Sequence, residues 1–102
     1  MRFVFRSKKL KRLYTDEAGA ERYPSEVVDA FFDKMAIIAA ANHENDLRAL
    51  KGLHFEKLKG ERGNRGHYSL RLNKQYRLTL TIETDREGVG KLLCILDIED
   101  YH

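Results

Sequence analysis

The sequence predicts an α+β domain in which two N-terminal helices pack on one face of a small antiparallel β-sheet. Apolar residues recur at helical spacing in the first half of the chain and alternate with polar ones in the second half. Short connections between the alternating segments favour antiparallel pairing. With 102 residues, 42% of them hydrophobic, the chain suffices for one core of modest size, so we expect a single domain over residues 1–102.

The first half is predicted to contain a short strand and two helices. Residues 2–5 favour a strand, and residues 8–14 carry apolar side chains at helical spacing. Pro24 and Ser25 mark the start of a second helix over residues 26–41, because proline fits the first turn and serine can cap exposed N–H groups. The predicted buried stripe of this helix consists of Val28, Phe31, Met35, Ile38 and Ala39.

The second half is predicted to form the sheet. Residues 45–50 favour a short helical turn, and Gly60, Gly63 and Gly66 predict a loop. Beyond this loop, alternation predicts three strands, over residues 68–72, 76–83 and 92–98. Cys94 lies in the apolar run of the last strand, where we expect a buried and unreactive side chain.

Charge is segregated along the chain. Residues 1–13 carry six Lys or Arg and no acid, residues 51–77 carry eight against Glu56 and Glu61, and the rest is acidic. If folding joins the two basic blocks, the result is a basic face on an acidic body, which is typical of a protein that binds a polyanion locally. The alternative is an ordinary solvated surface.

Several classes of protein are not favoured. The sequence has no apolar run of 18 residues and no basic leader followed by an apolar segment, so we expect a cytoplasmic protein without a membrane partner. One cysteine builds neither a disulfide nor a zinc site. Asp97, Glu99 and Asp100 are close in the sequence, but the first two share a strand face with no partner acid, so we predict no metal site and no cofactor.

The alternating segments predict a cationic surface. In a hairpin of the first two strands, Arg71 and Arg77 fall on one open face. An arginine fork suits phosphate binding through two parallel hydrogen bonds, whereas a single arginine on a strand is more often an exposed charge. Lys57, Lys59 and His102 lie near strand ends or faces of the same predicted sheet, which makes the set more specific.

Such a set suits metal-free cleavage of RNA. A general base takes the proton of the ribose 2′-OH, cations stabilise charge on the phosphate oxygens, and a general acid protonates the departing 5′ oxygen. The RNA supplies its own nucleophile. We therefore favour a metal-independent reaction over a magnesium nuclease.

At these residues the chain resembles the HigB branch of the RelE/ParE toxin superfamily, the plasmid-maintenance killer proteins. The resemblance covers nearly the whole chain and is carried by three motifs in order: Leu58-Lys59-Gly60, the segment from Tyr68 to Arg77, and the closing Asp100-Tyr101-His102. It implies a RelE-like fold and a ribosome-dependent mRNA endoribonuclease that acts in the A site of the small subunit and inhibits translation. It also implies a small helix-turn-helix antitoxin, HigA-like, as partner.

The resemblance also implies roles for individual residues. Lys59 matches the catalytic lysine that precedes glycine, Arg77 the phosphate-binding arginine, and His102 the terminal histidine, with Asp100 beside it. Gln75 stands where relatives often have a polar residue. The predicted substrate-binding residues are Lys57, Arg71, Asn73, Gln75, Tyr76, Asp100 and His54. Tyr76 has two readings, core packing and stacking on an unpaired base.

The general base stays open between two residues. Some HigB-like toxins have a histidine three residues before the lysine, where this chain has Glu56, and His54 is displaced by two. The two side chains share a face if this stretch is extended. Glu56 has the matching position and is favoured, while histidine is better matched to neutral pH. His43, placed near the end of a helix, and His67 are predicted to be structural or exposed.

Two other functions stay open at this stage. A ParE-like toxin binds a protein target, DNA gyrase, and a catalytically silent module binds only RNA or an antitoxin. The basic set and the terminal histidine count against the gyrase reading.

Overall fold

The computed structural model describes residues 1–84, 88 and 90–100. Five strands form one sheet in the order β1-β5-β4-β3-β2. The strands are β1 (Phe3–Phe5), β2 (Glu56–Lys57), β3 (His67–Arg71), β4 (Tyr76–Thr84) and β5 (Lys91–Asp100). The helices are α1 (Lys8–Asp16), α2 (Ser25–Ala40), α3 (Glu44–Ala49) and α4 (Gly60–Asn64), with 3-10 turns at Ala20–Arg22 and Lys51–Leu53.

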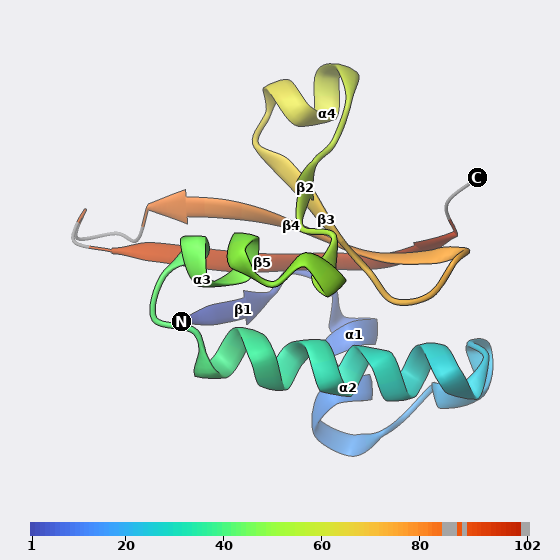
Figure 1. Cartoon of the computed structure of the whole chain (residues 1–102). Helices are drawn as coiled ribbons and strands as arrows, with labels where there is room; N and C mark the ends of the chain where they lie inside the picture. Colours follow the sequence, from blue (N-terminus) through green and yellow to red (C-terminus); the bar gives the residue numbers. More distant parts are fainter. Residues whose placement is uncertain (85–87, 89, 101–102) are drawn as a thin grey trace.

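The predicted α+β architecture is confirmed. Figure 1 shows α1, α2 and α3 together on one side of the sheet and α4 on the other side. The β3, β4 and β5 strands pair antiparallel, as predicted. Two features go beyond the prediction, because β1 pairs with β5 in parallel and the two-residue β2 extends the sheet beyond β3. Each helix within the described ranges is too short or too polar to cross a membrane.

The core lies between the sheet and α1 to α3. The fully buried stripe of α2 consists of Val27, Phe31, Met35 and Ile38. Val28 is only partly buried but packs against the core, whereas Ala39 is exposed, so Ala39 is the predicted core position that was wrong. Residues 27, 31, 35 and 38 follow the 3.6-residue period more closely than a stripe starting at 28, and Ala39 is turned about 100° away from Ile38.

The caps of the helices also differ from the prediction. Pro24 is the N-cap of α2 and its carbonyl accepts from Val27 and Val28, while no side chain caps this end. His43 lies at the start of α3 instead of at a helix end. Its Nδ1 accepts from the Asn45 N–H at 3.0 Å, and Asp46 accepts from the His43 N–H at 3.2 Å. This capping box gives His43 a structural role.

A bulge in the β4–β5 pairing decides which side chains of β5 reach the core. Thr79 pairs with Asp97, but the next residue, Leu80, pairs with Ile95. One extra residue in β5 reverses the alternation, so Ile95 faces the core while Asp97 faces the opposite side. Cys94 is buried, as predicted.

The predicted loop around the three glycines is wrong in one respect, because Gly60 to Asn64 form α4. Gly60, the first residue of this helix, and Gly66, just beyond its end, have positive φ angles of 71° and 80°, which glycine adopts without steric cost. Gly63 is buried, and a Cβ built there would lie 1.8 Å from the Leu58 carbonyl oxygen. The absence of a side chain thus lets α4 close tightly on the segment before it.

We expect Gly63→Ala to lower the free energy of unfolding by about 2 kcal/mol or more, because a buried backbone atom has to move. Gly52→Ala is the matched control, since a Cβ at Gly52 meets nothing within 4 Å. Urea denaturation of both variants measures the difference. Equal stability of the two variants would contradict the close packing of α4.

Candidate functional site

The β3–β4 hairpin brings two arginines side by side. Arg71 and Arg77 are direct cross-strand partners, which confirms that they share a face. Their neighbours Leu70, Leu72 and Leu78 are buried in the core on the other face. Arg71 Nε is buried and has no hydrogen-bond partner among the residues that the structure describes. A buried donor of this kind is suited to an anion.

Asn73 shapes the turn that joins these strands. Its Oδ1 accepts from the N–H groups of Gln75 at 2.8 Å and Tyr76 at 2.7 Å, which is the usual way in which asparagine stabilises a tight turn. Its Nδ2 donates to Glu26 Oε1 of α2 at 3.4 Å. The side chain that we predicted to contact substrate thus holds the hairpin in place.

Gln75, Tyr76 and Asp100 meet at one end of the sheet. Gln75 Nε2 donates to Asp100 Oδ2 at 2.9 Å, and Tyr76 is the cross-strand partner of Asp100. Tyr76 packs against the core, in line with the first of its two readings. His102, the predicted general acid, lies outside the described residues.

The two candidate bases approach each other. Glu56 pairs with Ser69 of β3, which places it on the face that carries Arg71. His54 has a left-handed φ of 48°, so the stretch is not uniformly extended. Its Nδ1 nevertheless lies 4.0 Å from Glu56 Oε1. Lys57 pairs with Tyr68, so the register places it on the other face of β2 from Glu56.

Lys59 is the N-cap residue of α4 and is exposed. One turn further along α4, Arg62 donates to both oxygens of Glu99, at 2.9 and 2.7 Å. Glu99 is the cross-strand partner of Arg77. The Lys59-bearing helix is therefore tied to the strand beside the arginine pair.

Sequence reasoning missed the contribution of Arg62, Glu99 and Thr79. Thr79 Oγ1 donates to Glu99 Oε2 at 2.8 Å. Hydrogen bonds from Arg62 first, and from Thr79 next, hold the pKa of the Glu99 carboxyl below its usual range, and the bonds to Glu99 raise the pKa of Arg62. Thr79 follows Arg77 by two residues on one predicted strand, and this spacing could have indicated that the two side chains share a face.

Two cations of the first basic block are paired with acids of β4 and β5. Arg6 lies 3.5 Å from Glu83, and Lys9 Nζ lies 3.3 Å from Asp97 Oδ1. Asp97 and Glu99 thus each have a cationic partner. Among the described residues, no three His, Cys, Asp or Glu side chains group as metal ligands would.

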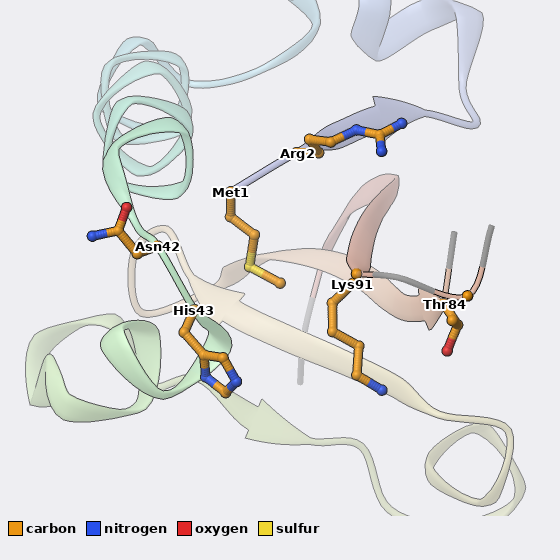
Figure 2. A pocket seen from close by; sticks show the side chains of 8 residues that line it. Met1, Arg2, Asn42, His43, Thr84 and Lys91 are labelled. Atoms are coloured by element: carbon orange, nitrogen blue, oxygen red, sulfur yellow. The ribbon is translucent and has the colours of Figure 1, made fainter. Parts of the chain in front are cut away.

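A hollow of about 580 Å³ lies at the other end of β4 and β5. Thr84 and Lys91 border it, whereas the arginine pair lies near the opposite end, where Tyr76 pairs with Asp100. Figure 2 shows His43 and Met1 on its other side, with the Asn42 amide turned away. This hollow contains none of the predicted site residues.

The comparisons with known proteins agree with the fold. The YoeB/ParE toxin from Agrobacterium tumefaciens aligns with a TM-score of 0.59 over 100% of both chains at 20% identity, which shows that the chain has the fold of these small toxins. Residues 3–93 match the family described as "RelE-like toxin of type II toxin-antitoxin system HigB". Toxin HigB-1 of Vibrio cholerae is 41% identical over 78 residues, which are 76% of this chain and 80% of that protein.

The chain belongs to the HigB family of RelE-like toxins of type II toxin-antitoxin systems. Membership implies an antitoxin as partner. The family match includes Glu56, Lys59, Arg71 and Arg77, and it ends before Asp100 and His102.

The Arg62–Glu99 ion pair predicts a pH-dependent stability. Because the folded pKa of Glu99 is lowered, the pair stabilises the protein above the unfolded value of about 4.3. This contribution disappears as the pH falls through the lower folded pKa. We expect Glu99→Gln to cost about 1 kcal/mol at pH 7 and progressively less below about pH 4, as measured by urea denaturation at several pH values.

Glu61→Gln is the control, since Glu61 pairs with Arg65 within α4 and both side chains are mostly exposed. It should cost only about 0.3 kcal/mol. A Glu99→Gln penalty that stays constant down to acidic pH would rule out the ion pair as its source.

Proposed function

We propose that this toxin is a metal-independent endoribonuclease that cleaves mRNA on the ribosome and thereby inhibits translation. The observation that carries the proposal is the Arg71–Arg77 pair, on the sheet face over which α4, with Lys59 as its N-cap residue, lies. Arg71 Nε is a buried donor without a partner among the described residues. A phosphodiester supplies an acceptor and a negative charge for such a donor.

The chemistry follows from the side chains around this pair. Arg77, with Arg71 beside it, holds the scissile phosphate, and Lys59 stabilises the negative charge that develops on its oxygens. A base removes the proton of the 2′-OH, which then attacks phosphorus and expels the 5′ oxygen. The RNA supplies the nucleophile, so these steps require only proton transfer and charge stabilisation.

Glu56 is the proposed base. It shares the sheet face of the arginines, and a carboxylate accepts the 2′-OH proton directly. His54, 4.0 Å away, orients the carboxylate or takes up its proton. His102 is the proposed general acid, on the strength of the family resemblance, because an imidazole titrates near about pH 6.5 and donates a proton readily at neutral pH.

The partners follow from an open site. The cationic groups lie on a sheet face, and such a surface suits a polymer presented by a larger particle. We propose that mRNA in the small ribosomal subunit is the substrate and that Gln75 and Asp100, hydrogen-bonded to each other, contact the RNA near the arginines. A helix-turn-helix antitoxin of the HigA type is the proposed neutralising partner.

We expect Arg77→Ala to reduce cleavage on programmed ribosomes by about 100-fold or more, since a donor to the transition-state charge is lost. Arg77→Lys should restore little, because a point charge does not reproduce the fork. Mapping of mRNA 5′ ends after induction measures cleavage in cells. Arg22→Ala, an exposed arginine of the turn before α2, should behave like the wild type.

Growth arrest with intact mRNA would contradict an RNA-cleaving toxin, and double-strand DNA breaks in the same cells would point to gyrase instead. Full activity of a folded Arg77→Ala variant would remove this residue from the mechanism.

The identity of the base is decided by comparing Glu56→Gln with His54→Ala in single-turnover cleavage. We expect Glu56→Gln to lower the rate by about 100-fold or more, with ribosome binding retained, because general-base catalysis contributes on that order. His54→Ala should have a small effect. The reverse ranking assigns the base to His54, and near-normal rates in both variants contradict either assignment.

A further inference from the structure

We propose that Arg62, Glu99 and Thr79 are positioning residues that hold Lys59 in register with the Arg71–Arg77 pair. This inference rests on the proposed function, because it assumes that Lys59 and the arginines act on one phosphate. It assigns a role to three side chains that make no contact with substrate in the proposed reaction.

The contacts form a continuous chain from α4 to the arginine pair. Both terminal nitrogens of Arg62 bind both carboxylate oxygens of Glu99, an arrangement that fixes direction as well as distance. Thr79, buried in β4, donates to the same carboxylate. Thr79 lies two residues from Arg77 on the same strand, and Glu99 is the cross-strand partner of Arg77. These contacts thus fix the position of α4 relative to the strand that carries Arg77.

A helix of five residues needs contacts of this kind to hold it on the sheet. Isolated helices shorter than about 12 residues are marginal in water, and α4 has only one turn and a half of backbone. Besides the fork, α4 is anchored by the close packing of Gly63 on Leu58 and by the hydrogen bond from the Leu58 N–H to the His67 carbonyl, 2.9 Å long. These backbone contacts hold one side of the helix, and the bidentate Arg62–Glu99 ion pair fixes its rotation over the sheet.

A fixed position of α4 also fixes the backbone of Lys59. It is the N-cap residue, three positions before Arg62, so the two lie within one helical turn of each other. A flexible lysine on a loosely attached turn would reach the phosphate only part of the time. A lysine whose backbone is held in place starts close to the position that it needs in the transition state.

Direct RNA binding by Arg62 is the competing interpretation, and the geometry disfavours it. Its fork is occupied by Glu99, whose side chain is 32% exposed against 47% for Arg62. The hydrogen bonds from Arg62 hold the Glu99 carboxylate in the pair and lower its pKa. An RNA phosphate would have to displace a bidentate partner that is already in place.

The test measures single-turnover cleavage on programmed ribosomes with Arg62→Gln, Glu99→Gln and Thr79→Val, each in the wild-type and the Lys59→Ala background. Arg65→Gln is the matched control, because Arg65, the C-cap residue of α4, pairs with Glu61 at 2.9 Å instead of with Glu99. Circular dichroism and urea denaturation verify that each variant is folded.

We expect Arg62→Gln and Glu99→Gln each to lower the maximal rate by about 10-fold or more, since a displacement of about 1 Å at a catalytic group has effects of this order. The toxin concentration at half-saturation should change little, and Arg65→Gln should match the wild type. In the Lys59→Ala background the same substitutions should have almost no additional effect, because residues that act through one another are not additive.

Three outcomes would overturn the inference. Full additivity with Lys59→Ala means that the network acts independently of Lys59. A raised half-saturating concentration for Arg62→Gln alone means that Arg62 contacts RNA. Wild-type rates for all three variants mean that α4 does not need the Arg62–Glu99–Thr79 contacts to position Lys59. If Arg62→Gln fails to fold, Thr79→Val, which removes only a hydroxyl, applies the same criteria. Absence of cleavage by the wild-type toxin itself removes the proposed function, and with it this inference.

Discussion

The register between β4 and β5 is the constraint on which the rest of the structure depends. Side chains alternate along a strand, so a shift by one residue exchanges the two faces. The bulge beside Thr79 and Leu80 makes this exchange within β5 itself. Leu93 and Ile95 complete the core, while Asp97 and Glu99, at the same odd positions, face the arginines and Arg62. Without the extra residue, one of these two sets would lie on the wrong side.

The arginine pair shows a conflict between stability and function. Like charges directly opposite each other on neighbouring strands are destabilising, and Arg71 keeps a buried donor without a partner in the described part of the chain. Glu99, the cross-strand partner of Arg77, is itself held by Arg62 and Thr79. A fold that keeps such a pair is prepared for an external anion, and violations of this kind are expected at functional sites.

The site also depends on a small element that contributes little to the core. Of the residues in α4, Gly63 alone is buried, yet this helix presents Lys59 and extends Arg62 to the sheet. The core is built by α1 to α3 on one face of the sheet. The opposite face is thereby left to α4 and to the polar ends of the strands. This separation lets the opposite face carry charge without disturbing the packing of the core.

The sequence-based predictions were correct where a pattern within one segment decides the structure, and they failed where contacts between segments decide it. The α+β class, the α2 helix, the three antiparallel strands and the shared face of Arg71 and Arg77 rest on local periodicity, and they were correct. The predicted stripe of α2 began at Val28, which packs against the core but is less buried than its apolar neighbour Val27. The glycine-rich segment was assigned to a loop, since nothing local indicates that the Leu58 carbonyl needs space at Gly63.

The sequence by itself therefore determined the periodic elements, the cationic hairpin and, through its motifs, the resemblance to a toxin family. Only the tertiary structure decided that β1 runs parallel to β5, that Lys57 and Glu56 point to different sides, and that Arg62 reaches Glu99. The physical reason is that alternation and helical period act within a segment, whereas Arg62 and Glu99 are 37 positions apart and β1 pairs with β5 from the other end of the chain. Such contacts depend on a bulge and a helix docking that no local pattern specifies.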